Sequence, residues 1–141
     1  MRSRLFKAFQ EEGLPYGNLL ETYNTRLAQE LALWADEQPG GAALHDALLV
    51  AVFVDGRNIG DPAVLLDLVD ACGLDRAGAS EVLEQRSRAS QLLAEWTFAK
   101  TTGLTGVPAF IAGGMAVVGA QPLATLEHLL ERAGASRLPK T

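Results

Sequence analysis

Residues 105–122 constrain the fold of this chain more than any other part of its sequence. They read Thr-Gly-Val-Pro-Ala-Phe-Ile-Ala-Gly-Gly-Met-Ala-Val-Val-Gly-Ala-Gln-Pro. Two runs of β-type residues, 107–112 and 115–118, flank a Gly-Gly pair that suits a two-residue turn with positive φ. Pro108 cannot donate to a strand ladder, so it belongs at a strand start or edge. The stretch therefore predicts a β-hairpin, followed by a helix that Pro122 opens.

Most of the rest of the chain is expected to be helical, because its apolar residues recur at helical spacing, whereas residues 16–22 are expected to be extended or irregular. Asn24 and Asp75 are suitable N-caps, and Asp61-Pro62 places a cap before a first-turn proline. Residues 42–54 are apolar almost all round and are interpreted as a buried helix, with a strand as the alternative. Trp34 and Trp96 are assigned to the core. The predicted helices carry the apolar residues Leu5 to Phe9, Leu27 to Trp34, 42–54, Leu65 to Cys72, Val82 and Leu83, Ala89 to Ala99, and Leu123 to Ala133.

Length and composition predict one domain over residues 1–141. Hydrophobic residues make up 48% of the 141 residues, which is enough for a core. The net charge is −5 and the basic residues are scattered, so we expect no nucleic-acid partner. No apolar run is long enough to cross a membrane, and the first residues do not resemble a secretory signal. We expect no membrane association and a cytoplasmic location.

Cys72 is the single cysteine, so the chain can form no internal disulfide, which suits a reducing compartment. It falls on the stripe of Leu65 and Val69, and we interpret it as a buried, unreactive thiol. His45 and His128 have no metal-ligand spacing and are interpreted as surface histidines or as histidines with satisfied hydrogen bonds. We expect no metal, no cofactor and no catalytic residue within these 141 residues.

Several segments together resemble the DsbA-like thioredoxin family, and most closely its FrnE-type branch of dithiol oxidoreductases and isomerases. Asn24-Thr25-Arg26-Leu27-Ala28 is similar to the Asn-Thr-x-x-Ala helix start of that branch. Residues 45–61 resemble its His-x-Ala-Leu to Gly-Asp segment. Residues 105–110 and 119–122 resemble its Thr-Gly-Val-Pro-Thr-Phe hairpin and Gly-Ala-Gln-Pro helix entry, with Ala109 where threonine is common. The resemblance covers about residues 4–132.

The resemblance implies a mostly helical α+β fold, an incomplete thioredoxin-like fold. Residues 1–103 would form the helical insertion region, residues 104–134 the cis-proline hairpin and C-terminal helix, and residues 135–141 a tail. The β-α-β unit that carries Cys-x-x-Cys in the family has no counterpart here. In the family the cis-proline loop lies beside that dithiol and clamps an extended substrate, which implies a substrate-binding role for Gly106, Val107 and Pro108. Asn24 would lie near the same groove.

Two classes of function remain open at this point. In the first, the chain supplies the helical lid and cis-proline loop of a thiol–disulfide oxidoreductase, binds an extended peptide or thiol substrate, and has no autonomous redox activity. In the second, it is a non-catalytic binding or oligomerisation module, and a second copy or a partner chain covers the exposed hairpin edge. A remnant of a glutathione-dependent isomerase, similar to 2-hydroxychromene-2-carboxylate isomerase, is a further alternative.

Overall fold

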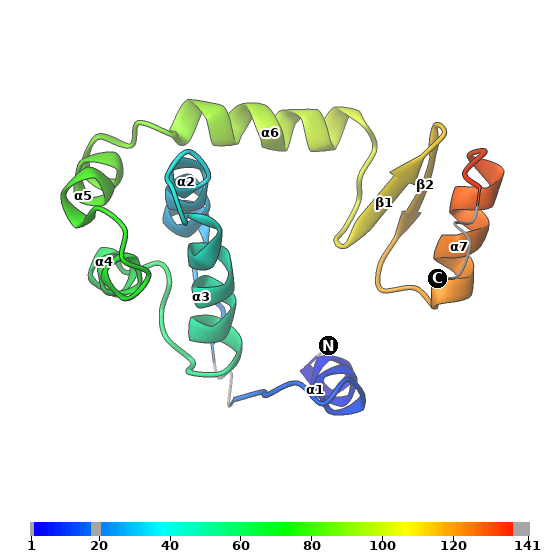
Figure 1. The fold of residues 1–141 in the computed structure, drawn as a ribbon, viewed down its shortest axis with the longest axis horizontal. Helices are drawn as coiled ribbons and strands as arrows, with labels where there is room; N and C mark the ends of the chain where they lie inside the picture. The colour runs from blue at the N-terminus through cyan, green and yellow to red at the C-terminus, as the bar shows by residue number, and fades with distance from the viewer. Residues whose placement is uncertain (1, 18–20, 137–141) are drawn as a thin grey trace. The chain divides into compact units, whose positions relative to one another are not determined.

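The computed structural model describes residues 2–17 and 21–136, which form a mostly helical α+β structure. Within these ranges are seven α-helices and one antiparallel sheet of two strands (Figure 1). The mostly helical α+β fold expected from the sequence is thereby confirmed. The elements are α1 (Arg2–Glu11), α2 (Arg26–Ala35), α3 (Ala42–Phe53), α4 (Pro62–Ala71), α5 (Arg76–Gln85), α6 (Ala89–Thr101), β1 (Ala109–Ala112), β2 (Met115–Val118) and α7 (Leu123–Arg132).

The chain divides into two compact units, Met1–Leu93 and Ala94–Thr141, and each is described by itself. In the first unit α2 packs on α3 and α5, and α4 packs on the same two helices. Leu31, Leu44, Leu65 and Val69 are fully buried between them. Burying a leucine side chain contributes about 1.5–3 kcal/mol, so these contacts hold the four helices together.

The helix ends of the first unit follow from local sequence. The Asp61 carboxylate accepts a hydrogen bond from the Ala63 N–H at 2.9 Å, with Pro62 in the first turn of α4. The Asp75 carboxylate accepts from the N–H groups of Ala77 and Gly78 at the start of α5. The caps predicted at Asp61 and Asp75 are confirmed.

Segment 42–54 is helical over Ala42–Phe53, so the alternative of a strand is wrong. The expectation that this helix is buried holds for one side only. Leu44 and Leu48 face the core, whereas Leu49 and Val50 are 56% and 48% exposed. The core packs against one side of α3, and Leu49 and Val50 on the other side stay about half exposed.

Two further burial assignments need correction. Trp34 is buried, as predicted, but Trp96 is 37% exposed, because α6 is apolar on several sides and buries only Leu92. Cys72 is half-buried instead of buried, because it lies after the last residue of α4, at the C-cap, where its side chain packs against the edge of the core.

The second unit contains the predicted hairpin. Ala109 pairs with Val118 and Ala112 with Met115, around the turn formed by Gly113 and Gly114. Both glycines have positive φ, +55° and +75°, the backbone that a two-residue hairpin turn requires. The first strand begins at Ala109, two residues later than predicted, because Pro108 has no N–H to place in the ladder.

Helix α7 covers one face of the hairpin. It begins at Leu123, with Pro122 just before its first turn, so the predicted helix entry is correct to one residue. Leu129 is its buried residue, whereas Leu130 is 50% exposed. The helix end approaches the turn so closely that a Cβ on Gly113 would lie 2.9 Å from the Cβ of Ala133.

Candidate functional site

The loop ahead of β1 presents one residue almost completely to solvent. Val107 is 92% exposed, and the Val107–Pro108 peptide bond is cis. Pro108 is tied to the hairpin, since its carbonyl oxygen accepts a hydrogen bond from the Gly119 N–H at 2.7 Å. Gly106 also lies close to β2, because a Cβ there would be 3.3 Å from Cγ1 of Val118. The loop is therefore hydrogen-bonded to the hairpin after Val107 and lies close to Val118 before it, while Val107 itself is exposed.

The outer edge of β1 follows from the alternation of an antiparallel ladder. Pro108 is hydrogen-bonded opposite Gly119, so Phe110 and Ala112 also direct their N–H and C=O groups toward β2. Ala109 and Ile111 lie between them, and their backbone groups therefore point away from β2. No described residue forms a hydrogen bond with the backbone of Val107. Among the described residues there is also no third strand beside β1.

Helix α7 covers one face of the hairpin and leaves the other face exposed. Met115 and Val117 lie toward α7 and line a hollow with Leu129. On the other face Ile111 is 56% exposed and Val118 is 36% exposed. An extended chain added beside β1 would meet unpaired backbone groups and an apolar surface together.

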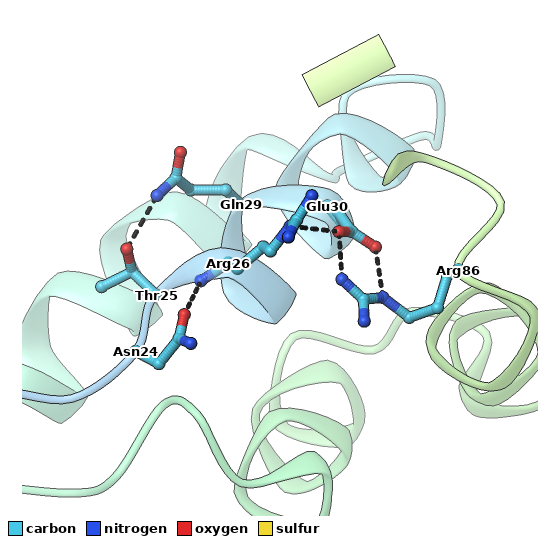
Figure 2. Close-up of polar contacts among 6 residues, drawn as sticks. All are labelled: Asn24, Thr25, Arg26, Gln29, Glu30 and Arg86. Carbon is cyan, nitrogen blue, oxygen red and sulfur yellow. Dashed lines mark hydrogen bonds and ion pairs between the residues drawn. The ribbon is translucent and has the colours of Figure 1, made fainter. Parts of the chain in front are cut away.

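Asn24 lies at the start of α2 in the first unit (Figure 2). Its side-chain oxygen accepts a hydrogen bond from the Arg26 N–H at 3.0 Å. The N-cap position itself belongs to Thr25, so the predicted cap is displaced by one residue. Thr25 Oγ1 accepts a hydrogen bond from the Gln29 side chain at 2.7 Å and forms no side-chain cap to the backbone of α2.

The backbone beside Asn24 is closely packed. A Cβ on Gly60 would lie 2.9 Å from the Asn24 carbonyl oxygen, so glycine lets the turn before α4 approach the start of α2. Asn24 itself is exposed, and its neighbour Thr25 lines a hollow of about 230 Å³ between α2 and α3. Asn24 therefore stabilises the start of α2 through its hydrogen bond to the Arg26 N–H. A role of Asn24 in a substrate groove stays a prediction.

Sequence reasoning missed a buried ion pair. Glu30 is fully buried and accepts two hydrogen bonds from Arg86, while Arg26 lies 3.6 Å away (Figure 2). The hydrogen bond from Arg86 outweighs burial and holds the pKa of Glu30 below its usual value. The Arg26 to Glu30 spacing was visible as an i,i+4 pair, but the partner that matters is 56 residues away.

The other titratable residues singled out from the sequence do not form a reactive cluster. His45 contacts Asp36 at 2.7 Å, and both side chains are about half exposed. His128 is exposed on α7. Within residues 2–17 and 21–136 no three His, Cys, Asp or Glu side chains are grouped so that they could hold a metal ion. In the same ranges no helix is both long and apolar enough to cross a membrane.

Comparison with known proteins identifies the family. The family model described as the DSBA-like thioredoxin domain matches residues 1–131. The chain therefore belongs to the DSBA-like thioredoxin domain family, a family of the thiol–disulfide oxidoreductase type. No curated protein matches the chain.

Proposed function

We propose that this chain acts as the substrate-binding part of a thiol–disulfide oxidoreductase of the FrnE-type branch. In this proposal Gly106, Val107 and Pro108, with the outer edge of β1, bind an extended polypeptide by strand addition. The reacting dithiol lies outside these 141 residues, on a further segment or a partner chain. Family membership supports the class of reaction, and the hairpin edge supports the binding role.

The observation that carries the proposal is the combination of exposure and unpaired backbone at Val107. A valine that is 92% exposed contributes nothing to the core of its own unit. Its N–H and C=O groups have no partner among the described residues, while Pro108 and Gly119 fix the loop beside it. An incoming strand would satisfy these groups and those of Ala109 and Ile111.

The cysteine count supports the assignment of the reacting dithiol to a further segment or a partner chain. In thiol–disulfide exchange a thiolate attacks one sulfur of a disulfide, forms a mixed disulfide and releases the other sulfur as a thiolate. A second protein thiolate then attacks the first protein sulfur in the mixed disulfide, forms a new protein disulfide with it and releases the substrate sulfur as a thiolate. Cys72 is the single cysteine, so this chain could form a mixed disulfide but could not resolve it with a thiol of its own.

Binding can be tested with an unfolded polypeptide that lacks free thiols. We suggest titrating the ¹⁵N-labelled chain with reduced, S-carbamidomethylated insulin B chain and following backbone amide signals by NMR. Saturable shifts at Val107, Ala109 and Ile111, with slower hydrogen exchange at Ala109 and Ile111, are expected. Shifts confined to other surfaces, or no binding at millimolar peptide, would overturn the proposal.

A further inference from the structure

Helix α3 has an apolar surface that its own unit does not use. A helix that is apolar on all sides is normally buried on all sides. In α3, however, Leu44, Leu48 and Ala51 face the core, whereas Leu49 and Val50 are about half exposed. The residues on the exposed side are polar only at the first turns, where His45 and Asp46 lie.

A cavity of about 370 Å³ lies on this exposed side, within the first unit. Leu49, Val50 and Phe53 of α3 line it, together with Phe9 of α1 and Leu14. The rings of Phe9 and Phe53 are 5.7 Å apart, so α1 already touches α3 at one end of the cavity. The remaining volume lies at the lower end of the range for ligand pockets, which is about 300–1,000 Å³.

The apolar surface continues beyond the cavity along α3. Leu49 also lines the neighbouring hollow of about 230 Å³, which extends past His45 to Thr25. We call the apolar strip of α3 from His45 to Phe53 the α3 groove. At a rise of 1.5 Å per residue it is about 12 Å long. A strip of this length matches two turns of a helix laid against it, with apolar anchors at i, i+3 or i+4, and i+7.

The charge beside the groove specifies the chemistry of its partner. Asp46 lines the cavity and is exposed, and it forms no ion pair with any described residue. His45 does not compensate this charge, since it is engaged with Asp36. A carboxylate at the rim of an apolar groove is complementary to an ammonium or guanidinium group on the partner.

We propose that the α3 groove docks an amphipathic helix of a partner polypeptide, with a lysine or arginine that meets Asp46. The apolar side chains of that helix enter the cavity between Phe9 and Leu49. This site goes beyond the proposed function and does not depend on it, because it lies in the first unit and uses neither the loop of Val107 nor a thiol.

The test uses two synthetic 14-residue peptides with leucine on one helical face. One carries lysine on its polar face and the other carries glutamate. We expect the Leu/Lys peptide to bind the full chain with one-to-one stoichiometry, to shift the methyl signals of Leu49 and Val50 in NMR spectra, and to become helical on binding. We expect the Leu/Glu peptide to bind at least about tenfold more weakly.

Two matched pairs of variants distinguish peptide binding at the α3 groove from general electrostatic attraction of the peptide to an acidic chain. Asp46→Asn should weaken binding of the Leu/Lys peptide about fivefold, whereas Glu95→Gln, the same loss of charge on α6, should change it less than twofold. Leu49→Asn should weaken it at least about tenfold, whereas Leu130→Asn, at a leucine of similar exposure, should not. Equal effects within either pair would overturn the proposal. So would self-association of the free chain through α3, since the occupant would then be a second copy.

Discussion

The guanidinium of Arg86 forms two hydrogen bonds with the buried carboxylate of Glu30, Nε to Oε2 at 2.8 Å and Nη2 to Oε1 at 2.6 Å. Arg86 is at the C-cap of α5, and it is the non-glycine residue with positive φ among those described, at +53°. Its left-handed backbone ends α5, and its side chain reaches Glu30 on α2. The pair thus joins two helices of the first unit at a position that costs about 1 kcal/mol in backbone strain.

Arg86→Ala should destabilise the first unit by about 3 kcal/mol, because it leaves a buried carboxylate without its bidentate partner. Urea unfolding followed by Trp34 fluorescence in a Trp96→Phe background would measure this, since Trp34 is buried in the core of that unit. Arg88→Ala is the matched control. It removes the pair of Arg88 with the half-exposed Glu37 and should cost less than about 1 kcal/mol.

Arg86→Gly distinguishes the effect of losing the ion pair from the effect of backbone strain at residue 86. It removes the same hydrogen bonds but also the strain of a side chain at positive φ, so it should be less destabilising than Arg86→Ala by about 1 kcal/mol. If both variants are as stable as Arg88→Ala, the pair does not hold α2 and α5 together.

The pH dependence of stability follows from the direction of the Glu30 pKa. In the folded chain this pKa lies below the ordinary value of 4.5, mainly because Arg86 donates hydrogen bonds to the carboxylate. The pair therefore contributes its full stability above the unfolded pKa and loses it as the pH falls through the folded pKa. Glu30→Gln should be less stable than the parent at pH 7, and the difference should shrink below about pH 4.5. Parallel stability curves from pH 7 to pH 3 would contradict this assignment.

Redox assays address the role of Cys72. With dithiothreitol as reductant, the chain alone should reduce insulin disulfides no faster than dithiothreitol does, because one cysteine cannot resolve a mixed disulfide. Cys72→Ser should behave like the parent chain. Turnover by the parent chain that Cys72→Ser abolishes would show that the chain has redox activity of its own.

Local chemistry made much of the fold predictable. Asp61-Pro62, Asp75 and Gly113-Gly114 each favour one backbone geometry, and the structure has a helix start or a hairpin turn at each. Burial was less predictable where a segment is apolar all round. Neither α3 nor α6 has a polar stripe to mark its outer face, so Leu49 and Trp96 could not be placed outside the core in advance.

The candidate site, like the fold, could be predicted from the sequence only in part. The loop of Val107 and Pro108 could be predicted because glycine and proline mark it and because its sequence resembles a known family. The Glu30–Arg86 pair could not, because it depends on how α2 and α5 pack, and no local pattern joins residues 56 positions apart. The α3 groove likewise depends on which side of α3 the core occupies.

The central claim is that an extended polypeptide adds to the outer edge of β1, and a pair of alanine-to-proline variants tests it most directly. Ala109→Pro removes an N–H that points outward from β1, and Ala116→Pro removes one that points outward from the opposite edge, on β2. Both leave the hydrogen-bonded pairs between the strands in place, which unchanged amide signals of Phe110 and Val117 would verify.

The measurement is the affinity of both variants for S-carbamidomethylated insulin B chain. We expect Ala109→Pro to bind about tenfold more weakly than the parent, through the lost hydrogen bond and the bulk of the ring, and Ala116→Pro to bind within twofold of it. Equal affinities of the two variants, or a larger loss in Ala116→Pro, would contradict substrate binding at the edge beside Val107.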